Sequence, residues 1–321
     1  MKSIMRRVSS IYRKEGLVAL LRRSSNYVLE SASKKLGQPI LEWRYPDDGF
    51  NVLDEDWDTL VIFDCARYDV FTDVVGEDVS PRRSVASVTA NFLRRTFSKR
   101  TAHDTVYLSA NPIVGKNEEH LNTYKLVKSW ESRSSTTRKG QESPGIMDPK
   151  PLLERSVELH EKHPNKRHVV HLLPPHTPHE LKDGGPVPED SPYRNYKAAM
   201  KHGISPAEML DVYEENLLNA VQLTKEALAD VDGKVVFTAD HGELLGEGMP
   251  LWMKVLHHRW GNQFSKYDFG HYSNCNVSEL REVPWYVFQD GDRREIVAEE
   301  PIGSTRVDES VEAHLEALGY R

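Results

Sequence analysis

The chain has 321 residues, of which 38% are hydrophobic and 28% charged, and its formal net charge is −7 at pH 7. This is an ordinary globular composition, long enough for one large α/β domain or two smaller ones. No run of about 18 apolar residues occurs, so no transmembrane helix is expected, and two cysteines cannot form a disulfide framework. A cytoplasmic protein is therefore predicted.

Residues 1–36 form a basic segment ahead of an acidic body. They contain nine Lys or Arg and two Glu, a net charge of +7, so that the remainder carries about −14 of the total of −7. Ile4, Val8 and Ile11 recur at helical spacing, which predicts a basic helical arm over residues 1–45. Two interpretations stand side by side: the arm lies on an anionic membrane surface or partner, or it packs on the acidic body. No nucleic-acid partner is expected, because the body is acidic.

Short apolar or β-branched segments predict buried strands at Thr59–Phe63, Thr105–Leu108, His168–Leu173, Lys234–Thr238 and Trp285–Phe288. Such near-continuous apolar strands are typical of a sheet that is covered on both faces. The clearest predicted helix spans residues 205–229 and begins with Ser-Pro-Ala-Glu, a Ser N-cap followed by Pro. The sequence therefore predicts an α/β body over residues 46–321, with a doubly wound, mostly parallel sheet sandwiched by helices. Residues 129–151 and 174–193 are predicted to be loops.

Polar side chains gather at the ends or flanks of these predicted strands. Asp64 follows the first strand, His176 the third, and Asp240 and His241 the fourth, while His271 precedes the fifth. In an open α/β sheet, ligands bind outside the carboxyl ends of the strands. Carboxylates together with imidazoles suit zinc or manganese better than calcium or magnesium, which stay as alternatives.

Each of these residues also has an ordinary structural alternative. Asp64 is a candidate N-cap of the helix after its strand, and His176 a candidate exposed side chain in a proline-rich loop. Asp240 and His241 are candidates for a polar turn that closes a strand. The occurrence of all of them at one predicted edge of the sheet favours a site.

These residues, in this order, resemble the alkaline phosphatase and sulfatase superfamily, and within it the sulfatase-like proteins that carry no formylglycine. The resemblance runs from about residue 55 to the C-terminus. The matching segments are LVIFDCARYD (60–69), SVASVTANFLRRTF (84–97), LLPPHTPHE (172–180), the helix and strand ending in TADHGELLGE (213–247), and FGH with ELREVPWYVF (269–288). The resemblance implies an alkaline phosphatase-like catalytic domain.

The resemblance also implies roles for particular residues. Asp64, Asp240 and His241 match metal ligands, and Thr89, at the start of a helix-like segment, matches a nucleophile bound to the same metal. Ser87 is the alternative nucleophile.

His176 and His271 would bind ester oxygens, protonate the leaving group or complete a second metal site. The chain has no C/S-x-P-x-R signature, and Leu172 stands where two-metal members of the family have an Asp four residues before His176.

The expected function is that of a metal-dependent hydrolase or transferase of phosphate or sulfate esters, with a Thr nucleophile. Its expected substrate is a lipid-linked or surface glycan, reached through a peripheral membrane contact of residues 1–36. The alternatives are an unusual sulfuric ester hydrolase and a catalytically silent relative that binds anionic glycans.

Overall fold

The computed structural model of the chain describes residues 16–18, 24–25, 31, 33–76, 78–129, 148–179, 190–257 and 267–302. Most of the predicted basic arm, and most of the first predicted loop, lie outside these residues. The chain divides into two compact units, one of Met1–Tyr45 with Glu247–Asp268 and the other of Pro46–Gly246 with Phe269–Arg321. No helix of the described residues is both long enough and apolar enough to cross a membrane.

Three short helical elements of the smaller unit are described from end to end. These are the π-helical turn η1 (Ser33–Gly37), α2 (Gln38–Arg44) and α9 (Leu251–Leu256). The sequence predicted a helical arm over residues 1–45, but it did not predict that α9, from the middle of the second half of the chain, belongs to the same unit.

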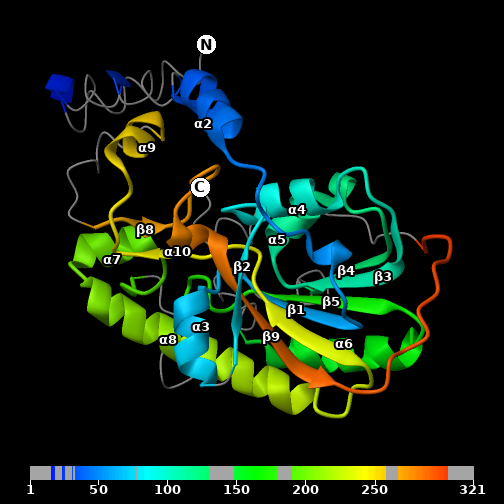
Figure 1. Cartoon of the computed structure of the whole chain (residues 1–321). Helices are drawn as coiled ribbons and strands as arrows, with labels where there is room; N and C mark the ends of the chain where they lie inside the picture. The colour runs from blue at the N-terminus through cyan, green and yellow to red at the C-terminus, as the bar shows by residue number, and fades with distance from the viewer. Residues whose placement is uncertain are drawn as a thin grey trace. The chain divides into compact units, whose positions relative to one another are not determined.

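The larger unit is built on a seven-stranded sheet in the order β2-β9-β6-β1-β5-β3-β4 (Figure 1). Five neighbouring strands, from β6 to β4, run parallel, whereas β9 runs antiparallel to both of its neighbours, β6 and the edge strand β2. The strands are β1 (Thr59–Phe63), β2 (Ser80–Arg83), β3 (Ala102–Ser109), β4 (Thr123–Lys128), β5 (Arg167–Leu172), β6 (Lys234–Thr238) and β9 (Glu282–Asp290). The predicted mostly parallel sheet is confirmed, with β1 at its centre.

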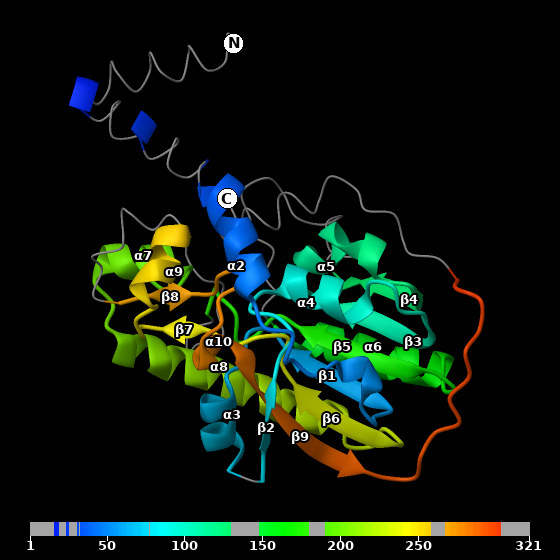
Figure 2. The same ribbon diagram turned by 45° about the horizontal axis from the view of Figure 1, so that its top comes forward.

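Helices cover both faces of this sheet, with α4 and α5 on one side and α3, α6 and α8 on the other (Figures 1 and 2). The helix α8 starts where the sequence predicted it, because Ser205 and Glu208 form a capping box at its N-terminus. The helices of this unit are α3 (Tyr68–Val75), α4 (Thr89–Phe97), α5 (Pro112–Lys116), α6 (Lys150–Lys162), α7 (Tyr196–His202), α8 (Pro206–Ala227) and α10 (Ser278–Arg281), with single 3-10 turns at Val52–Asp54 (η2) and Glu118–His120 (η3).

The core beneath α4 explains why the apolar strands were predicted correctly. Every residue of β1 is buried, and Leu60 and Ile62 pack in one cluster with Phe92 and Phe97 of α4 and Val169 of β5. A strand that is buried on both faces reads as a continuous apolar run.

Two strands of the sheet were not predicted, for the opposite reason. The strand β2 has the sequence SPRR and is mostly exposed, and β4, TYKLVK, mixes polar and apolar residues at the other edge. Edge strands bury less surface, so the apolar pattern that reveals a central strand is absent.

His160 of α6 is a buried histidine whose neutral form is stabilised by the fold. Its Nδ1 lies 2.8 Å from the carbonyl oxygen of Ser156 and its Nε2 lies 2.8 Å from Oγ1 of Thr59. An imidazole protonated at Nδ1 alone satisfies both partners, because Nδ1 then donates and Nε2 accepts from the hydroxyl. Burial lowers the pKa of His160 from 6.5 to about 4.

We expect this histidine to make the protein less stable in weak acid. Between pH 6.5 and 4 the unfolded chain takes up a proton at His160 that the folded chain refuses, so stability is lost as the pH falls through that window. The loss is on the order of 3 kcal/mol at one site. Urea unfolding of wild type and His160→Gln at several pH values should show the shallower pH dependence in the variant, and His103→Gln, at a half-buried histidine of β3, should keep the wild-type slope.

Candidate metal centre and catalytic site

Asp64 and Asp240 lie side by side because their strands are in register. Ile62 of β1 pairs with Thr238 of β6, and each aspartate stands two residues further on, beyond the carboxyl end of its strand. Oδ1 of Asp240 accepts the backbone N–H groups of Cys65 at 3.1 Å and of His241 at 3.0 Å, which fixes the turn after both strands. Adjacent parallel strands thus deliver two carboxylates to one point, the place where open α/β sheets bind ligands.

His241 completes a buried cluster with these two carboxylates. Its Nε2 lies 3.6 Å from Oδ1 of Asp64 and 3.5 Å from Oδ2 of Asp240. Its Nδ1 lies 2.8 Å from the carbonyl oxygen of Gly242, an acceptor, so the ring proton belongs on Nδ1. The lone pair of Nε2 is then directed toward the two carboxylates, as in histidines that bind a metal.

The carboxylate oxygens of this cluster are incompletely paired. Oδ1 of Asp64 and Oδ2 of Asp240 are buried and have no hydrogen-bond partner among the residues that the structure describes. Burial, followed by the charges of Asp240 and Glu243, raises the pKa of Asp64 well above 3.8. Buried polar atoms are normally paired, so orphaned oxygens around an imidazole lone pair fit a bound cation. Two carboxylates and one imidazole, with ligand atoms within 4.8 Å of one another, match the donors that zinc or manganese takes.

Thr89, the predicted nucleophile, opens helix α4 and lies against this cluster. Its Oγ1 is 3.3 Å from Nε2 of His241, and its side chain is buried. Ser87, the alternative nucleophile, is engaged elsewhere, since its Oγ donates to the carbonyl oxygen of Tyr272 at 2.8 Å and accepts from the N–H of Cys275 at 3.1 Å. The structure therefore brings Thr89, Asp64, Asp240 and His241 together, and gives Ser87 structural hydrogen bonds.

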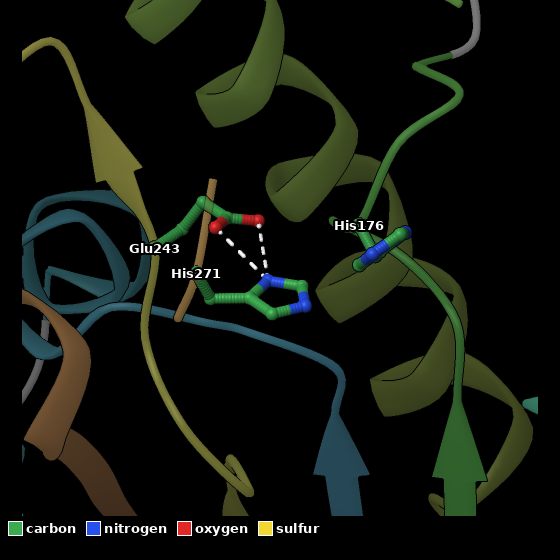
Figure 3. Close-up of side chains that lie close together, drawn as sticks. All are labelled: His176, Glu243 and His271. Carbon is green, nitrogen blue, oxygen red and sulfur yellow. Dashed lines mark hydrogen bonds and ion pairs between the residues drawn. The ribbon is translucent and has the colours of Figure 1, made fainter. Parts of the chain in front are cut away.

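A second cluster forms around Glu243, which the sequence left without a role. Two short strands, β7 (Leu244–Leu245) and β8 (Phe269–Gly270), pair antiparallel with Leu244 opposite Gly270. Glu243 precedes the first strand and His271 follows the second, so the register places them opposite one another. Nδ1 of His271 lies 3.1 Å and 3.3 Å from the two carboxylate oxygens of Glu243 (Figure 3).

His271 is the histidine of the site that favours its protonated form. Burial alone would lower its pKa, but the charge of Glu243 and the hydrogen bond to it outweigh burial, and the pKa of His271 is raised above 6.5. The same pair lowers the pKa of Glu243 against the effect of burial. The pair thus holds a proton near neutral pH, as a general acid must.

His176 lies beside this pair and is buried, not exposed in its loop (Figure 3). Its Nδ1 donates to the carbonyl oxygen of Thr177 at 2.5 Å, and its ring centroid is 5.4 Å from that of His271. Burial, then the neighbouring charge of His271, lowers the pKa of His176 to about 4. One ligand atom each from His176, Glu243 and His271 can be chosen within 4.8 Å of the others, so this trio is a second candidate cation site.

The positions of the predicted residues do not fit their ordinary structural alternatives. The N-cap of α3 is Arg67, without a side-chain cap, so Asp64 does not cap the helix after its strand. The ring centroids of His241 and His271 are 4.5 Å apart, which joins the two clusters into one buried polar region. Asp240 and His241 face inward to this region, and they do not form a solvent-facing turn.

Several supporting residues were missed by the sequence analysis. Nδ2 of Asn111 donates to Oδ2 of Asp64 at 2.6 Å, and Oγ of Ser84 donates to the carbonyl oxygen of Asp240 at 2.5 Å. Nδ1 of His171 in β5 lies 2.8 Å from the hydroxyl of Tyr107, and its Nε2 is 3.9 Å from Oδ2 of Asp240. Asn111 could have been predicted, because it follows the end of β3 closely, as Asp64 and Asp240 follow β1 and β6.

Gly242 is required by the approach of another segment. A Cβ atom there would lie 2.1 Å from the carbonyl oxygen of Glu279 in α10, and the N–H of Gly242 donates to the carbonyl oxygen of Leu280 at 2.9 Å. No larger residue fits without moving that backbone. The glycine therefore fixes α10 against the turn that carries the ligands.

Comparisons with known proteins give weak similarities. No family model and no curated protein matches the chain. Among the solved structures that resemble it are three at 12% identity each. The C-terminal periplasmic domain of EptC from Escherichia coli, in complex with zinc, has a TM-score of 0.42 over 75% of each chain. Ps i-CgsB in complex with k-i-k-neocarrahexaose has a TM-score of 0.34, over 82% of this chain and 72% of that one.

The third is the phosphoglycerol transferase GacH of Streptococcus pyogenes in complex with sn-glycerol-1-phosphate, with a TM-score of 0.30 over 78% of this chain and 75% of that one. At such TM-scores these likenesses identify neither the reaction nor the substrate of this chain. The α/β fold is established by its own strand order.

Proposed function

We propose that this chain is a metal-dependent enzyme that hydrolyses or transfers phosphate or sulfate esters, with Thr89 as its nucleophile. One observation carries the proposal: a buried hydroxyl, Thr89 Oγ1, stands 3.3 Å from an imidazole nitrogen that faces two carboxylates with orphaned oxygens. A purely structural cluster would have its buried oxygens paired.

Asp64, Asp240, His241 and Thr89 would hold the ion, with zinc or manganese as the preferred metal. When bound, a divalent cation would lower the pKa of a coordinated hydroxyl and offset the charge of the ester oxygens. The N-terminus of α4, at which Thr89 stands, adds partial positive charge at the same point. Oγ1 of Thr89, having lost its proton, would then attack phosphorus or sulfur, the bond to the leaving alcohol oxygen would break, and the phosphoryl or sulfuryl group would be held on Thr89 until water or an acceptor hydroxyl removes it.

His271, held by Glu243, would donate a proton to the leaving group. Because the ion pair with Glu243 raises the pKa of His271, this imidazole can keep a proton at Nε2 for the departing ester oxygen. His176, whose pKa is lowered, is neutral and suited to a hydrogen bond with an ester oxygen. The alternative role for His176, Glu243 and His271 is a second cation site.

The substrate is proposed to carry phosphate at least as readily as sulfate, because the formylglycine signature of sulfatases is missing. A matched series of aryl phosphate, aryl phosphodiester and aryl sulfate tests this, each assayed after chelation and re-addition of zinc, manganese, magnesium or calcium. We expect turnover of a phosphate ester that is lost with the chelator and restored best by zinc or manganese.

Two results of this screen would replace the proposal with its alternatives. Turnover of the aryl sulfate alone would indicate an unusual sulfuric ester hydrolase. No turnover with any ion, together with no rise in thermal stability on adding zinc or manganese, would indicate a catalytically silent relative that binds anionic glycans.

A further inference from the structure

The smaller unit exposes an unusual share of large apolar side chains. Eight of the thirteen exposed large hydrophobic residues in the described part of the chain belong to it, although it is much the smaller unit. Six of the eight lie on η1, α2 and α9 and are called here the α2–α9 patch: Leu36, Ile40, Trp43, Leu251, Trp252 and Val255. Trp43 is 81% exposed and Trp252 is 44% exposed, and an exposed tryptophan ordinarily marks an interaction site.

The two helices that carry this patch are packed tightly together within the unit. A Cβ atom on Gly37 would lie 2.4 Å from the carbonyl oxygen of Leu256, and Nε2 of Gln38 lies 3.3 Å from Nδ1 of His257. At the other end, the guanidinium of Arg44 stands 5.4 Å from the ring centre of Trp252. The start of α2 thus lies against the end of α9, and the end of α2 lies near the start of α9, so the two helices are side by side and antiparallel.

The apolar side chains of the patch are exposed because they lie on one face of the helices, and not because the helices are loosely packed. Leu36, Ile40 and Trp43 recur at intervals of four and three, the spacing of one helical face. Leu41 of α2 and Met253 of α9 are buried, so each helix also has an inward side. The unit therefore satisfies its own core and still directs a second apolar face outward.

The net charge of the smaller unit indicates what kind of surface the α2–α9 patch would bind. The smaller unit contains thirteen Lys or Arg and five Asp or Glu, a net of +8, whereas the rest of the chain carries −15. Exposed tryptophan and aliphatic side chains combined with a cationic excess are the features of helices that lie in the interface of an anionic membrane. A neutral or basic protein partner would explain the tryptophans but not the concentration of positive charge.

We propose that the α2–α9 patch docks this chain on an anionic lipid surface, with Trp43 and Trp252 at the level of the lipid headgroups. The basic residues of the same unit supply the attraction to the surface, and the patch supplies the apolar contact. This inference uses residues outside the site of Thr89 and holds whether or not the chain is an esterase.

Vesicle co-sedimentation of the full chain tests the patch. Wild type should sediment with phosphatidylcholine vesicles that contain phosphatidylglycerol, and poorly with phosphatidylcholine alone. Combined Trp43→Ser and Trp252→Ser should weaken binding to the anionic vesicles roughly tenfold or more. The matched control is Leu210→Ser with Leu218→Ser on α8, at side chains 37% and 38% exposed in the larger unit, which should bind like wild type.

The outcomes separate docking through the patch from attraction by charge alone. Because Trp43 and Trp252 are exposed, the variant should keep the circular dichroism spectrum and melting temperature of wild type. Unchanged vesicle binding in that folded variant would overturn the proposal and leave charge as the cause. Failure of wild type to bind anionic vesicles would overturn it too, and self-association lost with the two tryptophans would identify the patch as an interface between copies.

Discussion

Replacing Thr89 by alanine is expected to lower turnover of the best phosphate ester at least about a thousandfold, because no other hydroxyl in the described site stands against the His241 imidazole. The variant should keep its fold, since the change removes only one small side chain at the first turn of α4. It should also still bind the ion through Asp64, Asp240 and His241. Steady-state kinetics and a metal titration on the same preparation measure both expectations.

Ser87→Ala is the matched control for this experiment. Ser87 is two residues away and equally buried, but its hydroxyl is hydrogen-bonded to the Tyr272 carbonyl and the Cys275 N–H. Its loss should cost about 1 kcal/mol of stability and leave turnover within an order of magnitude of wild type. Full activity in Thr89→Ala combined with loss of activity in Ser87→Ala would move the nucleophile to Ser87.

A second comparison separates a chemical role of Thr89 from a packing role. Thr89→Ser keeps the hydroxyl and removes the methyl group, whereas Thr89→Val keeps the shape and removes the hydroxyl. We expect activity in the serine variant and none in the valine variant. The reverse order would mean that packing at the start of α4, and not the hydroxyl, supports turnover.

The candidate site could be predicted from the sequence where it depends on the ends of the central strands, and not where it depends on the pairing of very short strands or on packing. Asp64, Asp240 and His241 each follow an apolar run, and parallel neighbours bring such positions to the same edge. Glu243 and His271 are 28 residues apart and meet through a two-residue antiparallel pairing, which is too short to leave a pattern in the sequence. The contact of Ser84 with the carbonyl of Asp240 is likewise a product of packing.

The fold shows the same division. The bounds of central strands such as β1 and β6 were predicted correctly, because a strand that is buried on both faces has a nearly continuous run of apolar residues. The antiparallel direction of β9 could not be predicted from its sequence, since a strand has the same composition in either direction. The pairing of α2 with α9 depends on the close approach of the two backbones at Gly37. A single glycine in a sequence does not predict a contact with a segment that is more than 200 residues away.

The second large expected effect is a change in stability when the ion is removed with a chelator or when the carboxylate of Asp64, which would hold it, is replaced. In the presence of a chelator, Asp64 and Asp240 repel each other inside the protein, and the pKa of Asp64 is raised well above 3.8. A raised acid pKa means that the folded state keeps a proton that the unfolded state releases. The contribution of Asp64 to the stability of the chelated protein should therefore fall as the pH rises above 3.8 and through the folded-state pKa of Asp64.

Asp64→Asn should remove this contribution to the pH dependence. The neutral amide removes the repulsion, and its oxygen can still accept the hydrogen bond from Asn111, so the chelated variant should be at least as stable as chelated wild type. Wild type should gain about 2.7 kcal/mol at a zinc or manganese concentration one hundred times its Kd, and the variant should gain almost nothing. Thermal unfolding with chelator and with each ion gives both differences.

Glu243→Gln decides which cluster the ion occupies. This residue is as buried as Asp64 and loses the same charge, but it belongs to the trio with His176 and His271. If one ion binds at Asp64, Asp240 and His241, the glutamine variant keeps most of the metal-induced stabilisation, and calorimetric titration of wild type gives one site. Two sites in wild type, reduced to one in either variant, would show that both clusters bind ions. A metal response lost in Glu243→Gln and kept in Asp64→Asn would place the ion in the trio and refute the role given to Asp64.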